Sequence, residues 1–108
     1  MKGARLGEFE EFTLLAVRAL NDATYAVPVQ DFVERSVGRA VSMGAVYAAL
    51  DRLEAKGFVR SVLGDPTPQR GGKRKRLYEI TSSGMSTLRD LRRVRDRIWT
   101  TIEDGRRP

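Results

Sequence analysis

The sequence predicts a mostly α-helical fold with one small β-hairpin. Apolar residues recur at helical spacing in three early segments, and a short turn containing Gly38 joins the second segment to the third. Two strand-like runs then flank a loop rich in proline and glycine, and a long final segment repeats apolar residues at steps of three and four. This is the order of a winged helix-turn-helix, to which the last segment adds a C-terminal dimerisation helix.

Length and composition limit the class of protein. A chain of 108 residues, 41% hydrophobic and 31% charged, fits one globular domain whose modest core would gain from oligomerisation. The absence of cysteine and histidine removes disulfides, thiolate metal sites and the commonest general base. No apolar run approaches the roughly 18 residues of a membrane span, and the start lacks a signal peptide's apolar core. We therefore expect a cytoplasmic protein with no cofactor, no metal and no membrane contact.

The positive charge is concentrated in one short segment. The net charge is +6, of which residues 64–76 contribute +4, residues 77–108 contribute +2 and residues 1–63 contribute nothing. The charged residues of the first segment are Arg70, Lys73, Arg74, Lys75 and Arg76, against Asp65. Such a local cluster suits a polyanion such as nucleic acid, although a solvated basic loop that aids solubility has the same composition.

The first helix is expected over residues 8–20. Leu14 and Val17 fall outside its predicted apolar face, so the helix is apolar nearly all round and needs burial on two sides. We expect it to contact both its own core and a partner subunit. The predicted face holds Phe9, Phe12, Leu15, Ala16, Ala19 and Leu20.

Two further helices form the predicted helix-turn-helix. The earlier one begins near residues 25–28, because proline is tolerated in a first turn, and it ends at Gly38. The later one runs from a Ser42 N-cap to Lys56, with Gly57 as a left-handed cap against which Phe58 folds back. Its predicted inward stripe is Val46, Ala49, Leu50 and Leu53.

Strand-like runs at residues 58–63 and 74–80 complete the domain. The loop between them holds two prolines and three glycines, which predicts a hairpin. Thr81 or Ser82 is then expected to cap a last helix that continues to about Glu103. We divide the chain into a winged helix-turn-helix domain (residues 1–80), a dimerisation helix (residues 81–104) and a frayed tail (residues 105–108).

The predicted nucleic-acid interface combines the third helix with the basic loop. The outward residues of the helix at about 42–56 are mostly small, which would let it settle deeply into a major groove about 12 Å wide. The loop of residues 64–76 would act as a wing on the backbone or in the minor groove. Tyr47 could instead pack on the second helix, Arg76 could be structural, and an ordinary alanine-rich surface helix is the alternative. The residues expected at DNA are Gln30, Arg39, Ser42, Gly44, Ala45 and Tyr47 near the bases, and Arg70, Lys73, Arg74 and Lys75 on phosphates or in the minor groove.

Residues 6–10 (LGEFE), 41–57 (VSMGAVYAALDRLEAKG) and 71–84 (GGKRKRLYEITSSG) together resemble the PadR (phenolic acid decarboxylase regulator) family in its short form. The resemblance covers nearly the whole chain. It implies a dimeric winged-helix repressor that holds DNA with its third helix and wing, and whose last helix crosses to the partner subunit. Residues 25–29 (YAVPV) depart from the family's Tyr-Gly and acidic residue, which leaves the contacts of this helix start open.

The last helix carries the predicted dimer seam, with Val94 and Trp99 beside it. Arg95 interrupts the apolar repeat and is expected to pair with a carboxylate of the partner, from residue 8, 10 or 11. By resemblance to drug-sensing short members of the family, Trp99 could stack a small flat apolar or aromatic effector between subunits, or it could simply anchor the dimer. The seam residues are Leu88, Leu91, Arg95, Ile98 and Ile102, with Phe9 and Phe12 of the first helix as a second wall.

These features predict a sequence-specific DNA-binding transcriptional regulator. It would act as a homodimer, as a repressor, on a two-fold-related operator in double-stranded DNA. We expect no enzyme, because the carboxylates are scattered on helix surfaces and residues 71–73 (GGK) lack the spacing of a phosphate-binding loop. The alternative is a winged-helix module whose basic tip binds a protein or RNA partner.

Overall fold

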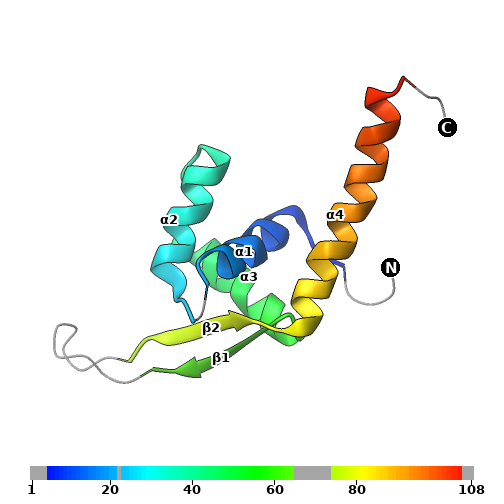
Figure 1. Ribbon diagram of the computed structural model, residues 1–108. Helices are drawn as coiled ribbons and strands as arrows, with labels where there is room; N and C mark the ends of the chain where they lie inside the picture. Colours follow the sequence, from blue (N-terminus) through cyan, green and yellow to red (C-terminus); the bar gives the residue numbers. More distant parts are fainter. Residues whose placement is uncertain (1–4, 22, 65–73, 106–108) are drawn as a thin grey trace.

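The computed structural model describes residues 5–21, 23–64 and 74–105 (Figure 1). They form α1 (Glu8–Ala19), α2 (Ala26–Val37), α3 (Met43–Ala55), β1 (Val59–Leu63), β2 (Arg76–Ile80) and α4 (Ser82–Glu103). The predicted mostly helical fold with one hairpin is therefore confirmed. Arg70 and Lys73 of the predicted wing and the last three residues of the predicted frayed tail lie outside the described residues.

The first three helices and the hairpin share one core. Every residue of the inward stripe predicted for α3 is fully buried, and the Tyr78 side chain of β2 is 2% exposed. Burial of that phenol is the largest influence on its pKa, which lies above the usual value. The core residues include Leu14, Val17, Val29, Val33, Val46, Leu50, Leu53, Phe58, Val59, Tyr78 and Leu88.

The buried face of α1 differs from the prediction. Leu14 and Val17, which fall outside the predicted apolar face, are fully buried, whereas Leu15 is 42% exposed and Ala19 is also exposed. The reason is that α1 contacts α2, α3 and β2 as well as α4, so the domain core takes the face that holds Leu14 and Val17. Leu15 and Ala19 instead turn toward α4, where both line a cleft.

The caps of α3 form as the sequence predicts. The Ser42 hydroxyl accepts a hydrogen bond from the Ala45 amide at 3.1 Å, which satisfies one free N–H group of the first turn. At the other end Gly57 has φ +79°, and the Phe58 amide donates to the Leu53 carbonyl at 2.9 Å. This is a Schellman ending, and it turns the chain directly into β1.

The hairpin is held to the helices through a short backbone bridge. β1 and β2 pair antiparallel, from Val59 opposite Ile80 to Leu63 opposite Arg76. Thr24, in the connection between α1 and α2, adds a bridge on the other edge of β2: its amide donates to the Tyr78 carbonyl at 2.9 Å and its carbonyl accepts from the Tyr78 amide at 2.6 Å. The base of the wing is therefore fixed to the start of α2.

Only the first part of α4 packs on the domain. Thr81 is its N-cap, accepting from the Gly84 amide at 3.0 Å, and its buried residues are Gly84 and Leu88. The C-terminal end of α4 extends away from the other helices (Figure 1), and the radius of gyration, 16.1 Å, exceeds the value of about 13 Å for a compact chain of this length. Within residues 5–21, 23–64 and 74–105 no helix is long and apolar enough to cross a membrane.

Candidate nucleic-acid interface

A groove of about 230 Å³ lies between the start of α2, the outer face of α3 and the base of the wing. It brings together three of the predicted DNA-contacting residues, Tyr47, Arg74 and Lys75, although they come from distant parts of the sequence. Its basic residues have no carboxylate beside them among the described lining residues. The groove is lined by Tyr25, Ala26, Val27, Tyr47, Arg74, Lys75 and Arg76.

The residues on the outer face of α3 that are predicted to contact DNA bases are accessible. Ser42 and Gly44 are exposed, Ala45 is half-buried, and the Tyr47 ring is 48% exposed. The Ser42 oxygen accepts the cap hydrogen bond, so its hydroxyl hydrogen is still available to a ligand. Arg39 is exposed in the turn before α3 and does not line the groove.

The turn between α2 and α3 is held by two side chains of α2. The Gln30 amide donates to the Val41 carbonyl at 2.8 Å, and the Glu34 carboxylate accepts from the Val41 amide at 2.8 Å. Both backbone groups of Val41 are thus satisfied within the chain. Gln30, which was predicted near the bases, therefore uses its amide N–H to hold the turn. The positions of Gln30 and Glu34, four residues apart on one face of α2, were the sequence signal for this role.

Two side-chain contacts add to the backbone bridge at Thr24 in attaching the wing to the helices. The Arg76 guanidinium donates to the Ser61 hydroxyl at 3.0 Å, and that hydroxyl donates to the Glu54 carboxylate of α3 at 2.7 Å. The Lys75 ammonium lies 4.1 Å from the centre of the Tyr25 ring, a cation–π contact. Lys75 and Arg76 therefore help hold the wing. Lys75 is half-buried, whereas Arg74 and Arg76 are exposed.

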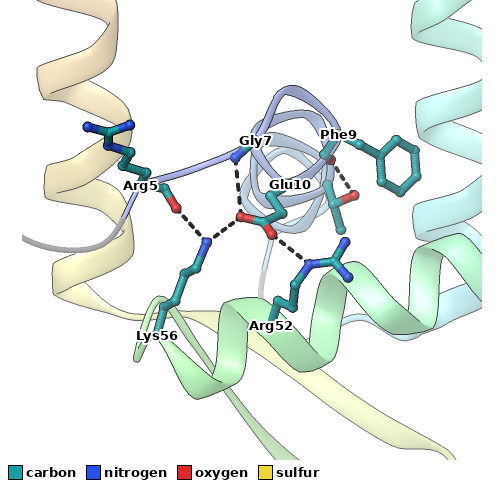
Figure 2. Close-up of polar contacts among 7 residues, drawn as sticks. Arg5, Gly7, Phe9, Glu10, Arg52 and Lys56 are labelled. Carbon is teal, nitrogen blue, oxygen red and sulfur yellow. Dashed lines mark hydrogen bonds and ion pairs between the residues drawn. The ribbon is translucent and has the colours of Figure 1, made fainter.

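A buried carboxylate connects α1 to the end of α3 (Figure 2). Glu10 is 7% exposed, and it accepts from the Arg52 guanidinium and the Lys56 ammonium at 2.6 Å each and from the Gly7 amide at 3.3 Å. Lys56 also donates to the Arg5 carbonyl. Burial, the largest influence, raises the pKa of Glu10, but the hydrogen bonds from Lys56, Arg52 and Gly7 outweigh it and hold the pKa below its usual value.

The residues of the predicted dimer seam fall into two groups. Leu88 lies in the chain's own core, Phe9 and Phe12 pack against that core, and Leu91 is half-buried. Arg95 pairs with Glu11 of the same chain at 2.6 Å, because α4 lies close enough to α1 to bring the two together. Its expected pairing with a carboxylate of a partner subunit stays a prediction. The exposed apolar residues of α4 are Val94 (42%), Ile98 (57%), Trp99 (58%) and Ile102 (58%).

A second, larger cleft of about 600 Å³ lies between α1 and α4. Its apolar lining is Leu15, Ala19, Met85, Leu88 and Trp99, and its charged lining is Arg18, Arg89, Arg92 and Arg95 with Glu11 and Asp96. Among the residues that the structure describes, no group of three or more histidine, cysteine, aspartate or glutamate side chains could hold a metal ion.

The arrangement of α2, turn, α3 and hairpin is that of a winged helix-turn-helix, and residues 15–90 match the transcriptional regulator PadR-like family. The chain belongs to this family. Membership confirms the predicted resemblance and makes the chain a PadR-like transcriptional regulator. No curated protein matches the chain.

Solved structures of PadR-like regulators share the fold. A PadR-like transcription factor from Bacteroides fragilis superposes with a TM-score of 0.74 at 20% identity, over 89% of this chain and 87% of that one. A PadR-like transcriptional regulator from Bacillus cereus superposes with a TM-score of 0.69 at 19% identity, over 89% and 88%. A structure described as the complex of hsRosR-S1 has a TM-score of 0.68 at 25% identity, over 93% and 91%.

Proposed function

We propose that this PadR-like regulator binds a specific, two-fold-related site in double-stranded DNA as a homodimer and represses transcription. The groove carries the proposal, because it sets the exposed Tyr47 of α3 beside three basic residues of the wing base. In this arrangement α3 would lie in the major groove, with Ser42, Ala45 and Tyr47 toward the bases. Arg74, together with Arg70 and Lys73, which lie outside the described residues, would contact phosphates or the minor groove.

Selection of bound fragments from a random DNA pool tests this proposal. A homodimer should enrich a palindromic motif whose half-sites are about one helical turn apart. Binding should also weaken steeply with salt, because phosphate contacts release counterions. Weak binding without sequence preference would instead favour the alternative, a winged-helix module for an RNA or protein partner, and would overturn the proposal.

Two substitutions separate backbone contacts from base reading. Arg74→Ala should weaken binding to all sequences and lower the salt slope by about one, since one phosphate contact is lost. Tyr47→Ala should weaken binding mainly to the selected site and leave the affinity for other sequences nearly unchanged. Arg97→Ala, which removes one exposed positive charge from α4 away from the groove, is the matched control and should change neither quantity.

We further propose that the cleft between α1 and α4 admits a small flat aromatic effector that relieves DNA binding. Its volume of about 600 Å³ suits a drug-sized molecule, and Trp99 supplies a stacking surface. Four arginines against two carboxylates in the lining favour a neutral or anionic ligand over a cation. Because Trp99 is the only tryptophan, its fluorescence can be titrated with planar aromatic anions and matched cations, and absence of quenching by any of them would remove the effector.

A further inference from the structure

Glu10, in the first turn of α1, carries a carboxylate that is almost fully buried, and both of its oxygens accept hydrogen bonds. One oxygen of Glu10 accepts from Lys56 at 2.6 Å and from the Gly7 amide at 3.3 Å, and the other accepts from Arg52 at 2.6 Å (Figure 2). The hydrogen bond from Gly7 is an ordinary N-terminal capping contact, which a helix with Glu or Gln at its third position commonly makes. The two cations are different, because both come from another helix.

Arg52 and Lys56 lie at the C-terminal end of α3, where their positive charges also complement the helix dipole. The Glu10 side chain is 9% exposed and that of Lys56 25%, so the ammonium and carboxylate are largely withdrawn from water. A buried carboxylate that loses its partners is strongly unfavourable, which penalises any movement of the end of α3 away from α1. Glu10 therefore holds the C-terminal end of α3, the proposed recognition helix, against the first turn of α1.

The next residue makes the corresponding contact with α4. Glu11, whose side chain is 15% exposed, pairs with Arg95 at 2.6 Å. Arg95 lies at the middle of α4, beyond the part of that helix which the core covers. Two successive carboxylates thus connect one turn of α1 to two different helices, α3 through Glu10 and α4 through Glu11.

We propose that the first turn of α1 is a positioning element for DNA recognition, in which Glu10 and Glu11 fix the recognition helix relative to α4. This inference rests on the proposed function, since it takes α3 to read DNA and α4 to join the subunits. In such a dimer the angle between α3 and α4 sets the distance between the two copies of α3. That distance selects the spacing between half-sites.

The test compares Glu10→Gln and Glu11→Gln with Glu8→Gln. All three substitutions remove one negative charge from the same helical turn while keeping the size of the side chain. Glu8 is exposed and has no ion pair in the described part of the chain, so it is the matched control. Binding is measured to the selected site, to versions of that site with one base pair added or removed between the half-sites, and to unrelated DNA.

Glu10→Gln should bind the selected site about tenfold more weakly than Glu8→Gln, which corresponds to about 1.4 kcal/mol. Affinity for unrelated DNA, which the wing dominates, should stay within about twofold. Both Glu10→Gln and Glu11→Gln should discriminate less between the altered spacings. Equal behaviour of all three variants would overturn the proposal, as would an equal loss on selected and unrelated DNA.

Hydrogen exchange gives a readout that does not depend on DNA. Amides at the end of α3 should exchange faster in Glu10→Gln, and amides of α4 near Arg95 should exchange faster in Glu11→Gln, each relative to Glu8→Gln. If the wild-type protein selects no DNA site, the proposed function fails, but hydrogen exchange still tests whether Glu10 and Glu11 hold α3 and α4 in place. Exchange rates equal to those of Glu8→Gln would reject that positioning role. Should Glu10→Gln not fold, Arg52→Gln removes a half-exposed partner of the same carboxylate and takes its place.

Discussion

Gly84 and Gly44 both lie in helices, but an added methyl group would meet different surroundings at the two positions. At Gly84 a Cβ atom would overlap the Phe58 carbonyl oxygen and crowd the Ile80 side chain, whereas at Gly44 nothing lies within 4 Å. Because the Phe58 obstacle is backbone, Gly84→Ala must push α4 away from the end of α3 and the start of β1. We expect it to lower the free energy of unfolding by about 1–3 kcal/mol, measured by urea denaturation.

Gly44→Ala is the control for that prediction. It should raise stability by up to about 1 kcal/mol, because alanine favours a helix more than glycine does. If Gly44 faces DNA, as the sequence predicts, the same variant should nevertheless bind the selected site less well. A destabilised Gly44→Ala, or a fully stable Gly84→Ala, would contradict the packing described for these two helices.

The pH dependence of stability at Glu10 has a defined sign. Its pKa in the folded chain lies below the usual value of about 4.5, so its contribution to stability is complete above that value and is lost as the pH falls through the folded pKa. The free energy of unfolding of the wild-type protein should therefore decrease below about pH 4.5. Glu10→Gln should start lower and decrease less steeply than Glu8→Gln over the same range, and parallel curves for the two variants would contradict the assignment.

Residue roles were predictable where the partner is close in sequence. Ser42 as a cap and Gly57 as a left-handed residue follow from rules that span a few positions, and both are confirmed. Glu10 was named only as one of three carboxylates for a partner's arginine, because Arg52 and Lys56 follow it by more than forty residues. Lys75 over Tyr25 was missed for the same reason: only folding brings the wing back to the start of α2.

At the scale of elements, helix boundaries were more predictable than helix faces. α4 and the turn between α2 and α3 begin and end close to where capping residues and glycines indicate. The face of α1 was assigned wrongly, because a helix surrounded by α2, α3, β2 and α4 has apolar residues on several sides. Periodicity then cannot say which side is most deeply buried.

The wing depends on α2 for its direction, which gives a prediction for an element. Tyr25→Leu keeps an apolar side chain but removes the aromatic face under the Lys75 ammonium. We expect DNA affinity to fall about threefold on selected and unrelated sequences alike, since a contact of about 0.5–1 kcal/mol that orients the wing is lost. Fluorescence anisotropy with labelled DNA measures both affinities.

Tyr25→Phe is the control for this variant, because it retains the ring and should bind DNA nearly as well as the wild-type chain. The mechanism predicts that the melting temperatures of the Leu and Phe variants differ by only a few degrees, since the contact with the half-buried Lys75 is worth about 0.5–1 kcal/mol. A loss in Tyr25→Phe as large as that in Tyr25→Leu would assign the effect to the hydroxyl group and refute the cation–π explanation.

For the whole molecule, the distribution of apolar surface supports a partner subunit. Val94, Ile98, Trp99 and Ile102 lie on the half of α4 that extends from the domain, each at least 42% exposed. A helix with this much uncovered apolar surface on one element is typical of an interaction site. Because Leu88 lies in the chain's own core, we expect the dimer seam to begin near Leu91 and to lie mainly on the C-terminal half of α4.

Ile98→Asp tests that seam on the whole molecule. Ile98 is 57% exposed in the single chain, so the substitution should leave the fold of each subunit intact. In the proposed dimer it would bury an unpaired carboxylate, and we expect association to weaken by at least about thirtyfold, or about 2 kcal/mol. Sedimentation equilibrium measures the change, with Arg97→Asp as the control because Arg97 is exposed next to Ile98 but lies outside the apolar repeat.

Specific DNA binding should be lost together with the dimer, since one subunit can occupy only one half-site. A dimer that persists in Ile98→Asp, or a monomer that still binds the full site tightly, would place the subunit contact elsewhere on the molecule.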